Sequence, residues 1–214
     1  MDLSLRRQSR ALCLLDSPLD AQKEEEPMIN PVGRALRNRR AGHHTLVWAQ
    51  PDVQAPENFT LTSPAFEYGS PIPEHHRGRI FAANISPALT WTTPPAGTEE
   101  LVLIVQDPDV PGKRPATHDL TVGIDPSLKA IPENALTNPS PLSGVRHGKG
   151  PLGRLGWAGP APIPSHGPHS YVFQMFALNR RTTLTEKFTL AELRDAMAGH
   201  LVGRARLDGT YEIR

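Results

Sequence analysis

An apolar run meets a pair of carboxylates in the stretch Leu101-Val-Leu-Ile-Val-Gln-Asp-Pro-Asp-Val-Pro111. Residues 101–106 are apolar at nearly every position and include β-branched side chains, which predicts a strand covered on both faces. Asp107 and Asp109 follow directly, so two carboxylates leave the end of a buried strand together. Asp and Pro are also ordinary turn residues, and a plain turn is the alternative interpretation of this segment.

Short apolar runs on both sides of this stretch predict further strands. Residues 59–62 alternate between apolar and polar side chains, and residues 88–91 and 120–124 form short apolar runs. Residues 169–178 are aromatic and aliphatic without any Pro or Gly, which predicts a central strand. Strand-like alternation returns at residues 206–213.

One helix is predicted near the C-terminus, where Thr189 and Glu192 have the spacing of a capping box. Apolar side chains follow at helical spacing: Leu190, Leu193, Met197 and Leu201. With 23 Pro and 17 Gly among 214 residues, the chain should otherwise consist of short elements joined by turns, and the predicted fold class is mainly β.

The composition describes one globular domain with an appendage, with 38% hydrophobic and 21% charged residues. The formal net charge of +1 excludes the strongly positive electrostatic potential that sequence-independent binding of nucleic acid requires. No apolar run approaches the roughly 20 residues of a membrane span. Cys13 is the single cysteine and cannot form an internal disulfide, which fits a reducing, cytoplasmic location.

Residues 1–55 are interpreted as an N-terminal extension, partly disordered or helical and basic from residue 28, and residues 56–214 as the β domain. The apolar patch at 11–15 ends at Asp16, too early for a secretory signal. The arginines of the basic part could touch anionic lipid or a partner subunit, or simply lie on a solvated surface helix.

Candidate site residues occur after the first buried strand. His118 enters a predicted strand, and His169 and Tyr171 share one face of another while Ser170 points away. This separation and the lack of a Gly-x-Ser-x-Gly elbow argue against a serine hydrolase. The basic, glycine-rich loop at 144–156 lacks the features of a phosphate-binding P-loop, and it is either the rim of a site or a plain surface loop.

A set of short motifs appears in a characteristic order and spacing. They are Thr62-Ser-Pro-Ala-Phe66, Ile72-Pro73, Asn84-Ile-Ser-Pro-Ala-Leu-Thr-Trp91, Pro95-Ala-Gly-Thr98, Asp107-Pro-Asp-Val-Pro111, Gly156-Trp-Ala-Gly-Pro-Ala-Pro162 and His169-Ser-Tyr171. In these the chain resembles the phosphatidylethanolamine-binding protein (PEBP) family, also called Raf kinase inhibitor-like proteins, and most of all its bacterial YbhB/YbcL-like branch.

This resemblance implies a large central antiparallel sheet packed with a smaller sheet, a few peripheral helices and a small anion-accepting cavity. Carried over by position, the implied ligand-binding residues are Asp107, Asp109, Pro111, His118, Gly159, Pro160, Pro162, His169 and Tyr171. The chain departs from the family pattern at Ala116, Asp119 and Ser170, where larger aromatic or basic residues are usual. These departures predict a pocket wall that is less aromatic than in the family.

The expected function is therefore non-catalytic binding of a phosphorylated small molecule, such as a phospholipid head group, with no cofactor and no metal. Two imidazoles and a phenol would donate to a phosphate oxygen, and carboxylates would hold the far ring nitrogens. Affinity for phosphate should rise as the pH falls through about 6.5.

Two alternatives belong to other classes. One is a metal-dependent enzyme that uses His118, His169 and Asp107 or Asp109 as a two-histidine, one-carboxylate site. The other is a regulatory protein that masks a kinase or a protease through the basic loop at 146–154. A protein partner and a homodimer are left open, and no nucleic-acid partner is expected.

Overall fold

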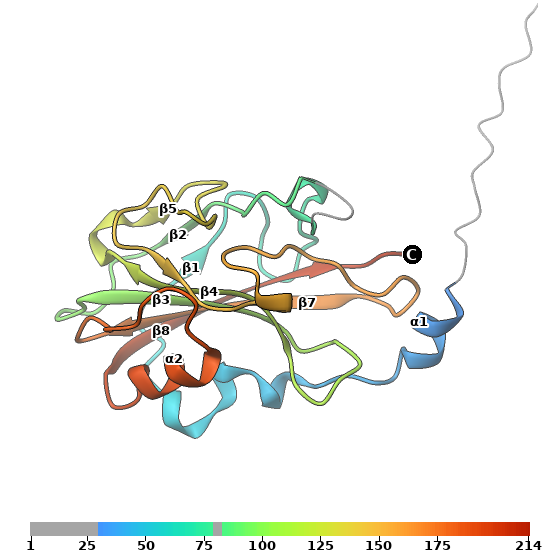
Figure 1. Ribbon diagram of the computed structural model, residues 1–214, viewed down its shortest axis with the longest axis horizontal. Coiled ribbons are helices and arrows are strands. Elements are labelled where there is room, and N and C mark those ends of the chain that lie inside the picture. The colour runs from blue at the N-terminus through green and yellow to red at the C-terminus, as the bar shows by residue number, and fades with distance from the viewer. Residues whose placement is uncertain (1–29, 79–82) are drawn as a thin grey trace, which may run out of the picture.

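The computed structural model describes residues 30–78 and 83–214 and consists of two antiparallel sheets with few helices (Figure 1). The larger sheet has the strand order β6-β4-β3-β7-β8, and the smaller one has the order β1-β2-β5. The strands are β1 (Leu61–Thr62), β2 (Leu89–Trp91), β3 (Glu100–Asp107), β4 (Ala116–Ile124), β5 (Ala130–Ile131), β6 (Arg146–His147), β7 (His169–Leu178) and β8 (Leu201–Tyr211). The predicted fold class, mainly β with a large and a small sheet, is confirmed.

Strand β3 lies inside the large sheet and is buried at every position. Leu101, Leu103 and Val105 contribute to the core between the two sheets. Val102 and Ile104 alternate with them and contribute to a second core on the opposite face. This second core is covered by helix α2 (Leu190–Met197) and by short turns of the N-terminal part. The prediction of a strand covered on both faces is thus confirmed.

Helix α2 begins as predicted, because the Thr189 hydroxyl accepts from the Glu192 amide and the Glu192 carboxylate accepts from the Thr189 amide. Its predicted length was wrong at the C-terminal end. The helix ends at Met197, and Gly199 adopts a positive φ of 76° that only glycine adopts easily. Leu201, predicted as a helical residue, instead begins β8 and pairs with Leu178.

Strand β4 is longer than the predicted run and contains a bulge that involves His118. Val105 pairs with Asp119, and the next residue of β3, Gln106, pairs with Thr117. His118 is therefore an extra residue without a partner in β3. A bulge of this kind re-aims a side chain, and it occurs here near the end of the strand pair.

The N-terminal part that the structure describes packs against the large sheet. Helix α1 (Pro31–Leu36) is capped by the Asn30 side chain, which accepts from two backbone amides of the first turn. Further along, the Ala41 amide donates to the Val110 carbonyl at 3.0 Å. Val47 and Val53 are buried in the second core. Residues 1–29 lie outside the described residues, and the expected domain boundary between residues 55 and 56 stays a prediction.

Among the described residues, no helix combines the length and the apolar character that crossing a bilayer requires.

Candidate functional site

A cavity of about 470 Å³ lies where β3, β4 and β7 meet the loops at 107–116 and 151–163. Five of the predicted site residues line it: Asp107, Pro111, His118, Pro162 and His169. The other predicted residues, Asp109, Gly159, Pro160 and Tyr171, lie outside the lining. The structure therefore brings together side chains from the consecutive strands β3 and β4 and from β7, which follows much later in the sequence.

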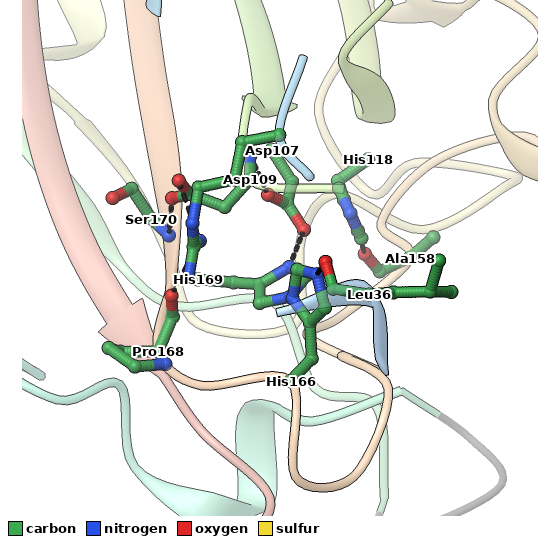
Figure 2. Close-up of polar contacts among 10 residues, drawn as sticks. Leu36, Asp107, Asp109, His118, Ala158, His166, Pro168, His169 and Ser170 are labelled. Carbon is green, nitrogen blue, oxygen red and sulfur yellow. Dashed lines mark hydrogen bonds and ion pairs between the residues drawn. The ribbon is translucent and has the colours of Figure 1, made fainter. Parts of the chain in front are cut away.

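A chain of buried hydrogen bonds runs through one wall of this cavity (Figure 2). The Asp107 Oδ2 atom lies 2.7 Å from His169 Nδ1, and His169 Nε2 lies 2.7 Å from His166 Nδ1. The chain ends on the N-terminal part of the molecule, where His166 Nε2 lies 2.9 Å from the Leu36 carbonyl oxygen. Asp107, His166 and His169 are each at most 2% exposed.

The protons of this chain can be counted, because a carbonyl oxygen only accepts. His166 must donate from Nε2 to Leu36, and the two bonds to His169 need one further proton each. Two neutral imidazoles carry one proton fewer than these bonds require. The two rings therefore share one positive charge when Asp107 is ionised, and the cluster of Asp107, His166 and His169 is neutral overall.

Of the two rings, His169 lies directly beside the carboxylate. Burial first, and then the charge of His169, lower the pKa of His166 below its usual range. The second oxygen of Asp107 accepts from the Asp109 backbone amide at 2.7 Å, which orients the carboxylate. The arrangement resembles the hydrogen bonding that fixes the tautomers of histidines in other functional sites.

His118 is held by a different group. Its Nδ1 atom lies 2.5 Å from the Ala158 carbonyl oxygen, so Nδ1 carries the proton and Nε2 carries the lone pair in the neutral ring. Burial lowers the pKa of His118, and the nearby Asp107 charge opposes this only in part. The Tyr171 ring packs edge-on against His118, with 5.0 Å between the ring centroids. Burial, followed by the Asp107 charge, raises the pKa of Tyr171 well above its ordinary value.

Asp109 faces the N-terminal part of the molecule instead of the cavity. Its carboxylate accepts from the Ser170 amide at 2.7 Å and pairs with Arg40 at 2.8 Å. Burial alone would raise the pKa of Asp109, but the Ser170 amide and the Arg40 guanidinium lower it below the usual value. Arg40 also donates to the Pro168 carbonyl, so Asp109 joins three segments.

The predicted Gly159 and Pro160 build the wall behind the cavity. A Cβ atom on Gly159 would lie 2.0 Å from the His76 carbonyl oxygen, so only glycine fits this approach. The Gly159 amide donates to Asn84, and the Pro160 carbonyl accepts from the Gly78 amide. These contacts attach the loop that contains both residues to Gly78 and to Asn84.

Several cavity residues were not singled out from the sequence. Asn84 lines the cavity and bridges Gly159 and the Trp157 carbonyl, and Arg154 lines it while donating to the same carbonyl at 3.1 Å. His166 was missed because it lies in a loop, where no periodicity indicates burial. Only the basic character of the loop at 144–156 pointed to Arg154, and its residues 151, 152 and 154 do lie at the cavity.

The remaining lining is apolar and, within the described part of the chain, includes no Phe, Tyr or Trp. Ala116 lines the cavity, whereas Asp119 does not. Asp119 is instead fully buried and accepts a hydrogen bond from the Thr121 hydroxyl. Burial raises the pKa of Asp119 to about 6, although the nearby His147 and the Thr121 hydrogen bond oppose this.

The geometry does not favour a metal site at these histidines. Both ring nitrogens of His169 are already hydrogen bonded, one to Asp107 and one to His166. Within residues 30–78 and 83–214, the cavity histidines and Asp107 also fail to form a trio of ligand atoms close enough for one ion.

The protein is thus a β protein of a recognisable class. Its antiparallel strands end beside a cavity, and a cluster of imidazoles and a carboxylate lies at those strand ends. Residues 62–212 match the model of the family described as phosphatidylethanolamine-binding protein. The chain belongs to the phosphatidylethanolamine-binding protein family, as its motifs indicated.

Relatives from bacteria agree with this assignment. The chain is 35% identical over 171 residues to LppC of Mycobacterium tuberculosis, across 78% of this chain and 79% of that protein. A solved structure of a PEBP homologue, CT736 from Chlamydia trachomatis, is 32% identical with a TM-score of 0.65, covering 73% of this chain and 98% of the other. For YbcL of E. coli the identity is 25% and the TM-score 0.67, with 73% and 99% covered. The name of LppC classes that relative as a lipoprotein, so the cytoplasmic location stays a prediction here.

Proposed function

We propose that this protein is a non-catalytic binding protein for a phosphorylated small molecule, such as a phospholipid head group, in the cavity beside His118 and His169. The observation that carries the proposal is the meeting of these two imidazoles, from different strands, in one cavity. A volume of about 470 Å³ is in the range of small-molecule sites.

The charges of the lining support an anionic ligand. The negative charge of Asp107 is balanced by the proton that His166 and His169 share, so this wall does not repel an anion. Arg154 supplies a positive charge at the cavity, and its guanidinium forms no ion pair with a carboxylate among the described residues. His118 can add a second positive charge when it is protonated.

The same lining supports binding without catalysis. It contains no Ser, Thr, Cys or Lys among the described residues, so no hydroxyl, thiol or amine nucleophile faces the ligand. His169 is held at both ring nitrogens and cannot act as a general base without breaking a buried hydrogen bond. The apolar remainder, with Val110 and Ile163, would contact the uncharged part of a ligand.

Calorimetric titration with phosphoethanolamine and with inorganic phosphate tests this function. We expect the wild-type protein to bind, and R154Q to lose about tenfold or more in affinity, because it removes a positive charge. H118Q should lose as much at about pH 5, where the wild-type imidazole can be protonated. H44A changes an exposed imidazole outside the cavity and should bind as the wild type does. Unchanged affinity in both R154Q and H118Q would refute the proposed site.

A further inference from the structure

Two adjacent histidines and a glutamate meet outside the cavity, next to the loop that contains Gly159. His75 and His76 lie in the short helical turn at Glu74–His76, and Glu133 lies in the turn after β5. One ligand atom from each of the three side chains lies within 4.8 Å of the other two. The His75 Nε2 atom is 3.5 Å from the Glu133 carboxylate, and both side chains are about half exposed, at 48% and 53%.

His76 differs from its neighbour because it is fully buried. Its Nδ1 atom lies 2.8 Å from the Ile85 carbonyl oxygen and therefore carries the ring proton. Its Nε2 atom is buried and has no hydrogen-bond partner among the described residues. Burial lowers the pKa of His76, so the ring is neutral and Nε2 keeps its lone pair.

A simple ion pair between His75 and Glu133 does not account for this arrangement. It leaves a buried nitrogen of His76 unsatisfied, which costs free energy. A neutral imidazole whose far nitrogen donates to a backbone carbonyl is also the usual form of a metal-ligating histidine. The adjacent Arg77, which would repel a cation, is paired with Glu74 at 2.8 Å and lies over the Tyr211 ring.

We propose that His75, His76 and Glu133 bind one divalent transition-metal ion of the zinc type. Two imidazoles and one carboxylate are ligands that Zn²⁺ accepts, with a fourth position open to water. The ion would satisfy the buried nitrogen of His76 and replace the 3.5 Å contact of His75 and Glu133 by two shorter bonds to metal.

This ion would stabilise the wall of the anion cavity. The His76 carbonyl accepts from the Trp157 indole at 3.1 Å, and the Gly78 amide donates to the Pro160 carbonyl at 2.9 Å. The segment at 75–78 is thus attached to the cavity loop on one side and, through the metal, to Glu133 on the other. Zn²⁺ should raise the Tm, because an ion that binds only the folded state stabilises it by mass action.

The test uses the full chain, purified without a metal-affinity tag, with Zn²⁺ titrated against a competing chromogenic chelator at pH 7.5. We expect one Zn²⁺ per chain, and a loss of about tenfold or more in affinity for H75A and E133Q. Both changes are at exposed side chains and should leave the fold intact. For the buried position, H76N keeps an N–H for Ile85 and removes the ligating nitrogen.

The chain contains a matched control in its other adjacent histidine pair, His43 and His44, which are exposed and form no close ligand trio with other residues that the structure describes. The double variant H43A/H44A should bind Zn²⁺ like the wild type and show the same rise in Tm. If H75A and E133Q keep the wild-type isotherm, or if H43A/H44A abolishes binding, the proposed site is wrong. Phosphoethanolamine titrations of H75A report on the cavity separately, so failure of one proposal is distinguishable from failure of the other.

Discussion

At the scale of single residues, the site depends on where protons lie. Asp107, His169 and His166 form a neutral buried cluster, while His118 stands apart with its own backbone acceptor. This difference between the hydrogen-bond partners of His169 and His118 was predicted only in part from the sequence. A carboxylate was expected behind each imidazole, but the group behind His118 is the Ala158 carbonyl, which no side-chain pattern can indicate.

Removal of the Asp107 charge should destabilise the fold. In D107A the two histidines lose the carboxylate that balances their shared proton, and His169 Nδ1 and the Asp109 amide lose their buried partner, which costs about 3 kcal/mol in the free energy of unfolding. Urea denaturation at pH 7 measures this free energy. D125A is the control, since Asp125 is exposed and only caps a turn through the Ser127 amide, a contact worth about 1 kcal/mol. A D107A variant that is no less stable than D125A would contradict the role of the Asp107 carboxylate.

The pH dependence of anion binding should follow His118. Because burial lowers the pKa of His118, the increase in affinity should begin below pH 6.5 instead of being centred there. A phosphodiester ligand keeps a constant charge between about pH 5 and 8, so calorimetry with it reports the protein alone. The H118Q variant should lose this increase, and a wild-type profile that is flat down to pH 5 would exclude protonation of His118 as the cause.

Asp119 should make stability fall as the pH rises. Its folded-state pKa of about 6 is above the unfolded value of 3.8, so its contribution is fully present below pH 3.8 and is lost as the pH rises through about 6. By pH 7 the loss amounts to about 3 kcal/mol from this group. Denaturation of D119N between pH 4 and 7 should lack this slope, and an unchanged slope would show that other groups cause it.

At the scale of secondary-structure elements, local sequence patterns predicted those elements whose limits do not depend on pairing with a neighbouring strand. Residues 169–178 form β7 as expected, and the capping box of Thr189 begins α2. The bulge at His118 and the start of β8 at Leu201 were not predictable in this way. Both depend on register with a neighbouring strand, which a single sequence does not display.

The loop that contains Gly159 should not tolerate a side chain at position 159. In G159A the new methyl group would lie 2.0 Å from the His76 carbonyl oxygen, and we expect a loss of about 1–3 kcal/mol in stability together with weaker anion binding. G112A is the control, because a Cβ atom there would meet its nearest neighbour at 3.5 Å. Thermal unfolding compares G159A with G112A. Equal Tm values would show that the cavity wall shifts to accommodate the added methyl group.

At the scale of the whole molecule, the sequence motifs predicted the two-sheet architecture and the segments that meet at the cavity. They did not predict that the N-terminal part would share in the site. Arg40 pairs with Asp109, and the Leu36 carbonyl accepts from His166, which contacts the cavity residue His169, although the basic stretch around them was interpreted as an arm or a surface helix. Contacts between segments 130 residues apart leave no local signal in composition or periodicity.

A shortened chain tests how far the folded unit extends. A protein of residues 56–214 loses Leu46, Val47 and Val53, which are at most 2% exposed, and should be less stable than one of residues 30–214 by roughly 5 kcal/mol. Thermal unfolding of both, compared with the full chain, measures the difference. Equal Tm values would support a domain boundary at residue 55.

The hydrogen bond from His166 to residue 36 has an evolutionary consequence, because its acceptor belongs to the main chain. Exchanging the leucine for another amino acid would leave that oxygen in place, so related chains could differ freely at this position while keeping the same tautomers in the pocket. Insertions or deletions between residues 36 and 41 would move the oxygen and change the imidazoles. Among relatives, then, spacing in this segment should be preserved more strictly than residue identity.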